Sequence, residues 1–199
     1  MDNLTEHIDV INPYSKGSIT SRELLMKDTI SHDTPLILTA TIHATIAHRT
    51  QFRKGTDIPY VTHPLQVART LAKESNYPVT SELIAAAILH DVVEDTTYDV
   101  ESFPEPVRRI VHLLSDPSGG DIDHRREAII RIQNEPDAIM VKMADRFCNL
   151  DEKNDYREKY HAKPSVREST RALLMIAQEA GLDETDIYQN LKEIVKEWE

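Results

Sequence analysis

The stretch from residue 81 to residue 95 reads SELIAAAILHDVVED, and it decides the fold. Seven apolar residues run without interruption from Leu83 to Leu89, so the segment offers no polar face to water. Alanine and leucine favour the helix, and a helix that is apolar all round is usually central and buried. The sequence therefore predicts a buried helix that runs directly into His90 and Asp91.

Apolar residues recur at helical spacing on both sides of this segment. Residues 51–62 interrupt the pattern with Gly55, Asp57 and Pro59 and are expected to form a loop or small hairpin. No strand-rich region is apparent, so the predicted fold class is all-α, a helical bundle with at most one short β-hairpin. Further helices are expected near 35–50, 64–71, 104–115, 123–133 and 136–150, followed by two amphipathic helices at the end.

The last expected helix carries an apolar stripe on one face. Its residues fall at helical spacing, and this face is expected either to pack internally or to form a homodimer contact. The stripe consists of Ile187, Leu191, Ile194, Val195 and Trp198.

Length and composition fit a single helical domain with an extension at its N-terminus. The chain has 199 residues, 40% of them hydrophobic, which suffices for one buried core. Residues 1–33 are mixed and polar, and we expect them to form an extension with at most short helices. Residues 34–199 are expected to form one domain. Because Cys148 is the sole cysteine, a disulfide framework is excluded.

Charge and hydropathy narrow the classes of function. The formal net charge is −11, whereas a groove that follows nucleic acid needs a basic face, so we expect no polynucleotide partner. No signal peptide is apparent, and no apolar run reaches the length that spans a membrane. We therefore expect a cytoplasmic protein. The nine histidines and the many acidic residues direct attention to metal binding.

Four ionisable residues follow the buried helix within six positions, namely His90, Asp91, Glu94 and Asp95. Such groups are costly in apolar surroundings unless something compensates them. A divalent metal can do so, because it takes imidazole nitrogen and carboxylate oxygen together. The alternative is a helix end that reaches solvent. If the helix continues, His90 and Glu94 share one face, as do Asp91 and Asp95.

Two residues elsewhere are candidates for the same metal. Asp145 lies in an otherwise apolar helix turn, where an acid needs a partner. The alternative for Asp145 is an internal ion pair with Arg146 or Lys142. His63 precedes Pro64, and taken alone such a histidine is more often a capping or packing residue than a ligand.

Taken in order, His63, His90-Asp91 and Asp145 reproduce an H…HD…D pattern, and their neighbours extend the match. The matching segments are HRTQFRKG (48–55), PYVTHPLQVA (59–68), AAILHDVVEDT (86–96) and VKMADRFCNL (141–150). Over roughly residues 36–155 the chain resembles the hydrolase domain of the RelA/SpoT homologues, within the HD superfamily. The long members carry a synthetase domain for which no room remains before Glu199, so the chain looks like the stand-alone branch, the small alarmone hydrolases.

The resemblance implies a reaction, a cofactor and a role for each site residue. It implies hydrolysis of the nucleotide (p)ppGpp at its 3′-pyrophosphate, giving GDP or GTP and pyrophosphate. One Mn²⁺ per chain is the implied cofactor. The implied metal ligands are His63, His90, Asp91 and Asp145, the implied catalytic pair is Glu94 and Asp95, and the implied substrate-binding residues are Arg53, Lys54, Lys142, Arg146 and Asn149.

Two departures from the family pattern concern the substrate more than the type of reaction. Asp151 and Glu152 stand where a basic residue is common, and the loop at 117–120 lacks a lysine that some small hydrolases carry. Two alternatives therefore stay open: an HD phosphohydrolase for another nucleotide, such as ppApp or the 2′-phosphate of NADPH, and an antitoxin-like neutraliser of an alarmone synthetase. Compensating positive charge is expected from Lys142, Arg125, Arg126 or Lys153.

Overall fold

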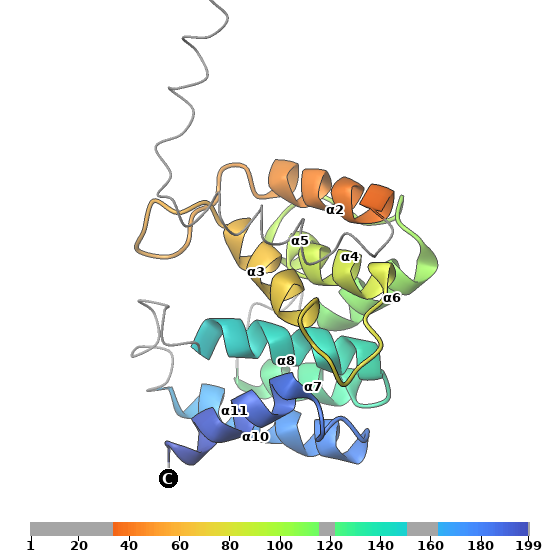
Figure 1. Ribbon diagram of the computed structural model, residues 1–199. Coiled ribbons are helices and arrows are strands. Elements are labelled where there is room, and N and C mark those ends of the chain that lie inside the picture. The colour runs from red at the N-terminus through yellow and green to blue at the C-terminus, as the bar shows by residue number, and fades with distance from the viewer. Residues whose placement is uncertain (1–33, 116–121, 151–162, 199) are drawn as a thin grey trace, which may run out of the picture.

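The computed structural model describes residues 34–115, 122–150 and 163–198, which form an all-helical bundle (Figure 1). In these ranges the one β feature is an isolated bridge between Phe52 and Pro59. The predicted fold class, a helical bundle with at most one short hairpin, is confirmed. The helices are α2 (Thr34–Ala47), α3 (Thr62–Leu71), α4 (Ser81–Leu89), α5 (Val92–Asp95), α6 (Glu105–Leu114), α7 (Ile122–Ile132), α8 (Pro136–Leu150), α10 (Pro164–Glu179) and α11 (Asp186–Lys196).

The predicted central helix is α4, and its apolar residues are closed off from solvent on all sides. Leu83 is 1% exposed and the six residues after it are 0% exposed. Helices α2, α3, α6 and α8 pack around it. Thr80 fixes the start of α4, because its hydroxyl accepts a hydrogen bond from the Leu83 amide, one of the donors that a helix start leaves open. The prediction of a buried helix that leads into His90 is confirmed.

Helices α3 and α8 carry the remaining candidate ligands and pack against each other and against α4. Figure 1 shows α2 at one end of the bundle, α10 and α11 at the other, and α8 between them. Helix α8 contacts α3, α6, α10 and α11, which explains why so many of its side chains are buried. A residue on α3 or α8 that faces the end of α4 therefore lies deep in the molecule.

The segment between α2 and α3 turns back on itself as a short hairpin-like loop. The Tyr60 amide donates to the Gln51 carbonyl at 2.9 Å, and the Arg53 amide donates to the Ile58 carbonyl at 2.7 Å. Gly55 lies in the turn with φ of 78°, a left-handed conformation that glycine adopts without steric conflict. The prediction of a loop or small hairpin in this segment is confirmed.

The apolar stripe of the last helix packs internally. Ile187 is 2% exposed and Leu191 is 0% exposed. Ile194, Val195 and Trp198 are partly buried against the same core. Internal packing, one of the two expectations for this face, is therefore what the structure shows, while a homodimer contact stays a prediction.

Some expectations fall outside the residues that the structure describes. They concern the extension at 1–33, the loop at 117–120, Asp151, Glu152, Lys153, and the side chains of Arg125 and Arg126. The domain boundary at residue 34 accordingly stays a prediction. No helix in the described ranges is long and apolar enough to cross a membrane.

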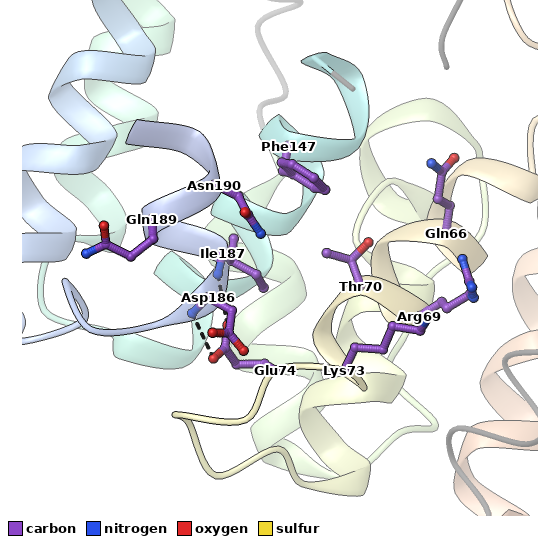
Figure 2. A pocket seen from close by; sticks show the side chains of 10 residues that line it. All are labelled: Gln66, Arg69, Thr70, Lys73, Glu74, Phe147, Asp186, Ile187, Gln189 and Asn190. Atoms are coloured by element: carbon purple, nitrogen blue, oxygen red, sulfur yellow. Dashed lines mark hydrogen bonds between the residues drawn. The ribbon is translucent and has the colours of Figure 1, made fainter. Parts of the chain in front are cut away.

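A cavity of about 500 Å³ lies where α3, α8 and α11 meet (Figure 2). Glu74, just beyond α3, accepts hydrogen bonds from the backbone amides of Asp186 and Ile187 at 3.0 Å each. This carboxylate thereby ties the first turn of α11 to the end of α3. The cavity is lined by Gln66, Arg69, Thr70, Lys73, Glu74, Phe147, Asp186, Ile187, Gln189 and Asn190.

Candidate metal centre

The His-Asp pair occupies a turn between two helices. Helix α4 ends at Leu89, and α5 begins at Val92, so the buried helix does not continue unbroken through the pair. Asp91 is the residue before α5, yet its carboxylate makes no capping hydrogen bond to that helix. The conditional expectation that His90 and Glu94 share one face of a continuous helix is therefore replaced by a turn that directs His90 and Asp91 inward.

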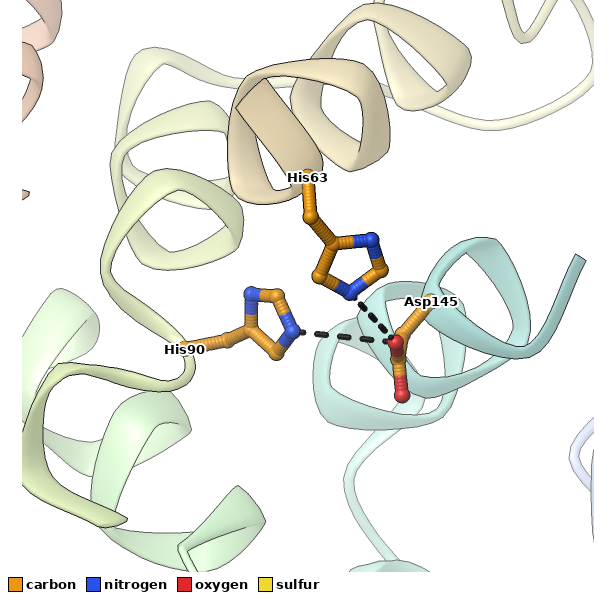
Figure 3. A group of neighbouring side chains, drawn as sticks. All are labelled: His63, His90 and Asp145. Carbon is orange, nitrogen blue, oxygen red and sulfur yellow. Dashed lines mark hydrogen bonds and ion pairs between the residues drawn. The ribbon is translucent and has the colours of Figure 1, made fainter. Parts of the chain in front are cut away.

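Three buried side chains, two from helices and one from this turn, meet here. His63 from α3 and His90 after α4 are each 2% exposed, and Asp145 from α8 is 8% exposed. One donor atom from each lies within 4.8 Å of the others. Asp145 Oδ1 lies 3.0 Å from His63 Nε2 and 3.8 Å from His90 Nε2, as Figure 3 shows. The structure thus brings together residues that are 82 positions apart in the chain.

The hydrogen bonds of His90 show which of its ring nitrogens faces the cluster as a ligand. Its Nδ1 lies 2.8 Å from the carbonyl oxygen of Ala87, so Nδ1 carries the proton and donates. In the neutral ring, Nε2 then has a free lone pair, which is the state a metal requires. Nε2 has no partner with hydrogen-bond geometry among the described residues. An imidazole held in this tautomer and aimed at carboxylates fits a metal ligand.

Asp91 stands beside the three buried residues as a fourth potential ligand. Its Oδ1 lies 3.1 Å from His90 Nε2, and its Oδ2 lies 3.9 Å from His63 Nε2. Its Oδ2 also accepts a 2.6 Å hydrogen bond from the hydroxyl of Tyr60. Burial first, and then the Asp91 carboxylate, raise the pKa of Tyr60, so the hydroxyl stays a donor at neutral pH.

Asp145 is held by two further side chains of α8. Asn149 Nδ2 donates to Asp145 Oδ1 at 2.7 Å. Lys142 Nζ lies 3.4 Å from Asp145 Oδ2. Burial alone would lower the pKa of Lys142, but the facing Asp145 carboxylate outweighs it and raises the pKa. Two residues predicted to bind substrate therefore border the cluster and contact one of its acids.

The cluster is electrostatically built for a cation. Burial opposes the charge of Asp91, yet the neighbouring His90 imidazole holds the pKa of this carboxyl well below its usual range. Burial likewise opposes the charge of Asp145, yet the Lys142 ammonium and the two histidines lower its pKa. Burial alone would lower the pKa of His90, but Asp91 and Asp145 raise it to about 10. Without a metal the carboxylates thus hold a proton on His90, and a divalent ion supplies the positive charge instead.

Glu94 and Asp95 lie on the short helix α5, directly after the turn, and both are exposed to solvent. Partial burial of the carboxyl, together with the nearby Asp91 charge, raises the pKa of Asp95. A raised carboxyl pKa is suited to proton transfer near neutral pH. The acids therefore lie on a solvent-facing element next to the cluster, and their roles stay predictions.

The predicted substrate-binding residues are distributed unevenly. Arg53 is half-buried and Lys54 is exposed, both in the hairpin-like loop. Arg146 differs, because it is 5% exposed and its Nη1 donates to the Val166 carbonyl and the Ser169 and Thr170 hydroxyls. These contacts of Nη1 join α8 to α10 in the interior and support a structural role. The assignment of Arg146 to substrate binding stays a prediction.

Sequence reasoning missed three residues that support the site. The Tyr60 ring lies 4.9 Å from the His48 ring and 5.9 Å from the His63 ring, measured between centroids. His48 Nδ1 donates to Gln51 Oε1, and Gln51 Nε2 donates to the Asp95 carbonyl at 2.8 Å. Tyr60 and Asp91 are 31 positions apart, so no local pattern reveals their contact. The one sequence signal was Tyr60 itself, an aromatic residue with a hydroxyl group three positions before His63.

Comparison with known proteins identifies an HD domain and several similar proteins. A family model described as an HD domain matches residues 40–173. Guanosine-3′,5′-bis(diphosphate) 3′-pyrophosphohydrolase MESH1 of Xenopus tropicalis is 36% identical over 130 residues, which cover 61% of this chain and 71% of that protein. GTP pyrophosphokinase of Streptomyces coelicolor is 30% identical over 146 residues, which cover 68% of this chain but only 17% of that protein.

A solved structure supports the fold. It is described as a metazoan ortholog of SpoT that hydrolyses ppGpp and plays a role in starvation responses. The match has a TM-score of 0.66 and 24% sequence identity, and it covers 83% of this chain and 97% of that one. At this identity the likeness shows a shared helical architecture.

Proposed function

This chain belongs to the HD-domain family, and from that premise we propose that it is a metal-dependent phosphohydrolase acting on (p)ppGpp. The proposed reaction cleaves the 3′-pyrophosphate and gives GDP or GTP and pyrophosphate. The proposed cofactor is one Mn²⁺ per chain. The similarity to MESH1 pyrophosphohydrolases at 34–36% identity supports this substrate class.

The observation that carries the proposal is the buried cluster of His63, His90 and Asp145 with Asp91 beside it. Two imidazoles and two carboxylates form a mixed nitrogen and oxygen set that suits Mn²⁺. A structural cluster would have its polar atoms paired, because unpaired buried groups are costly. In the described residues, His90 Nε2, the ring nitrogen that faces Asp91 and Asp145, has no hydrogen-bond partner.

Each side chain is assigned a task by its position. When bound, the metal supplies a Lewis acid for the phosphoryl group and lowers the pKa of water. Glu94 and Asp95 would orient the attacking water and accept its proton. Their place on exposed α5 supports this assignment, because water and nucleotide can reach them. Asn149 and Lys142 would contact a phosphate at the border of the cluster while holding Asp145.

Arg53 and Lys54 are proposed to fix the nucleoside and its 5′ phosphates. They lie in the hairpin-like loop, which ends where α3 begins at Thr62, one residue before His63. A guanidinium gives planar, bidentate or stacked contacts, and an ammonium gives a compact point charge. Such contacts hold the reacting phosphorus in place, which is a positioning effect on the rate.

A nucleotide panel tests the function. Metal-free protein is supplied with Mn²⁺ and given ppGpp, pppGpp, ppApp or NADPH, with chelator as the control. Release of pyrophosphate with GDP from ppGpp, dependent on the metal, is the expected result. Faster turnover of ppApp or NADPH would change the substrate, and metal binding without any turnover would favour a binding protein that neutralises an alarmone synthetase.

The products distinguish two kinds of hydrolysis. Ion-exchange analysis or phosphorus NMR should detect intact pyrophosphate and no 3′-monophosphate intermediate. Stepwise release of orthophosphate would mean that the terminal phosphate is attacked, and the chain would then be a general HD phosphatase.

A further inference from the structure

The two carboxylate oxygens of Asp91 have different surroundings. Oδ2 accepts a 2.6 Å hydrogen bond from the Tyr60 hydroxyl. The same Oδ2 lies 3.9 Å from His63 Nε2, and Oδ1 lies 3.1 Å from His90 Nε2. A short, charge-assisted hydrogen bond occupies one lone-pair position of that oxygen and fixes the orientation of the carboxylate. Asp91 therefore borders both histidines, with Oδ1 as the oxygen that makes no hydrogen bond to Tyr60.

The Tyr60 ring is fixed from several directions. Its ring centroid lies 4.9 Å from that of His48, which is 1% exposed, and 5.9 Å from that of His63. Its amide donates to the Gln51 carbonyl, and its own carbonyl accepts from the His63 amide at 2.8 Å. The hydroxyl is consequently held at Asp91 by packing and by backbone contacts on both sides.

The same loop also holds the proposed water-handling acids. His48 Nδ1 bonds Gln51 Oε1, and Gln51 Nε2 donates to the Asp95 carbonyl at 2.8 Å. One continuous set of contacts therefore joins the loop that carries Arg53 to Asp91 and to the end of α5. A side chain at the centre of this set can couple the placement of the loop to the geometry of a metal ligand.

We propose that Tyr60 is a positioning residue that fixes the orientation of the Asp91 carboxylate through its hydrogen bond to Oδ2 and so favours Oδ1 as the oxygen that binds the metal. Because it takes Asp91 as a ligand, this inference rests on the proposed function. Contacts behind a metal ligand orient it, and their loss typically weakens metal binding about 10–100-fold. Removing the hydroxyl would leave Asp91 Oδ2 unpaired and allow the carboxylate to rotate or to bind through both oxygens.

The direct test is a Mn²⁺ titration of the metal-free full chain by calorimetry. Tyr60→Phe should weaken Mn²⁺ binding by about 10–100-fold. The matched control is Tyr77→Phe, because the Tyr77 hydroxyl donates to Asp137 Oδ1 at 2.7 Å, away from the cluster. The control loses the same kind of hydrogen bond and should bind Mn²⁺ like the wild type.

A second measurement separates positioning from general loosening of the structure. Ca²⁺ accepts more oxygen ligands than Mn²⁺ and often binds carboxylates through both oxygens. Freed from Tyr60, Asp91 should favour Ca²⁺, so the ratio of Mn²⁺ to Ca²⁺ affinity should fall in Tyr60→Phe. A smaller folded fraction lowers both affinities equally and leaves this ratio unchanged.

The possible outcomes distinguish failure of the Tyr60 role from failure of the proposed metal-dependent function. If the wild type binds no Mn²⁺, the metal centre and the proposed function both fail. If the wild type binds Mn²⁺ while Tyr60→Phe binds within twofold and with the same ratio, only the role of Tyr60 is overturned. Equal weakening in the Tyr60 and Tyr77 variants with an unchanged ratio would also overturn it.

Discussion

The two ends of α3 each place a buried ionisable side chain in the interior, and the two are treated differently. At the start, His63 is 2% exposed, and its Nδ1 has no hydrogen-bond partner among the described residues. Beyond the end, Glu74 is 8% exposed, and its two oxygens accept from the amides of Asn76, Asp186 and Ile187 at 3.0 Å each. The first group is incompletely paired and the second is fully paired.

This difference in pairing distinguishes a candidate metal site, at His63, from a structural contact between helices, at Glu74. A buried carboxylate that receives fixed backbone amides has its charge stabilised and needs no ligand. A buried set of histidines and acids carries an energetic cost, and a bound cation can reduce it where an unpaired atom such as His90 Nε2 faces the acids. The cavity beside Glu74 in Figure 2 therefore does not by itself indicate chemistry, because Glu74 and Asp186 are engaged in holding α11.

Asp145→Asn should have the largest effect, because it removes the acid that both histidines face. The amide keeps the shape but loses the charge, so metal content should fall from about one per chain to none, and turnover should disappear. Elemental analysis after Mn²⁺ loading measures this. The matched control is Asp137→Asn on the same helix, whose carboxylate pairs with Tyr77, and it should keep its metal. Two metals per wild-type chain would refute the ligand set.

Glu94→Gln should have the second largest effect, because Glu94 is one of the two acids proposed to accept the proton of the attacking water. Loss of a general base typically lowers the rate about 10²–10⁴-fold. Metal content should stay unchanged, because Glu94 lies on exposed α5 and is not part of the buried cluster. Glu105→Gln, at an exposed position that opens α6, serves as the control and should leave turnover unaltered. Loss of metal in Glu94→Gln would instead make Glu94 a ligand.

The sequence predicts most of the site at the start of α3. It predicts little of the structural contact beyond the end of that helix. The run from Leu83 to Leu89 predicts α4 because burial on every side leaves a local compositional signal. The order of His63, His90-Asp91 and Asp145 matched a family pattern, so the cluster could be anticipated.

Glu74 and Arg146 could not be assigned in this way. Glu74 meets Asp186 and Ile187 across 112 and 113 positions, and Arg146 meets α10 across 20 to 24 positions. Such partners are set by packing of whole helices, and a single charged residue in a sequence does not indicate which backbone groups it will meet. The contacts of Arg146 Nη1 with α10 were for this reason not anticipated.

The stability of the metal-free protein should depend on pH through His90. The folded-state pKa of His90 is raised to about 10 from an ordinary value of 6.5. A raised pKa stabilises the fold fully below about pH 6.5, and this contribution is lost as pH rises through 10. The free energy of unfolding in chelator should therefore fall from about pH 7 to about pH 9.5.

Denaturant titrations at these pH values measure the effect, and one variant in the cluster and one beyond the end of α3 test its cause. Asp91→Asn removes a carboxylate that holds the His90 proton and should flatten the dependence. Glu74→Gln leaves the cluster intact and should keep the wild-type slope. An equal slope in Asp91→Asn would show that other groups cause the dependence.

Glu74→Gln should give the smallest effect, and on stability alone. The glutamine keeps one acceptor oxygen but places an NH₂ group against backbone amides that need acceptors. Hydrogen bonds to a charged group contribute about 1.5–3 kcal/mol, so a loss of about 2 kcal/mol in the free energy of unfolding is expected. Denaturant unfolding measures this loss, and a Mn²⁺ titration of the same variant should give the wild-type affinity.

An exposed acid provides the matched control for that change. Glu101→Gln removes a carboxylate whose partners are Arg108 and His112 on the surface, where water and salt screen ion pairs. Its effect should be smaller than that of Glu74→Gln, because water replaces the lost contacts at Glu101 but not at the buried Glu74. If Glu74→Gln instead weakened Mn²⁺ binding while leaving stability intact, full pairing would not identify a structural group. The contrast between the two ends of α3 would then be wrong.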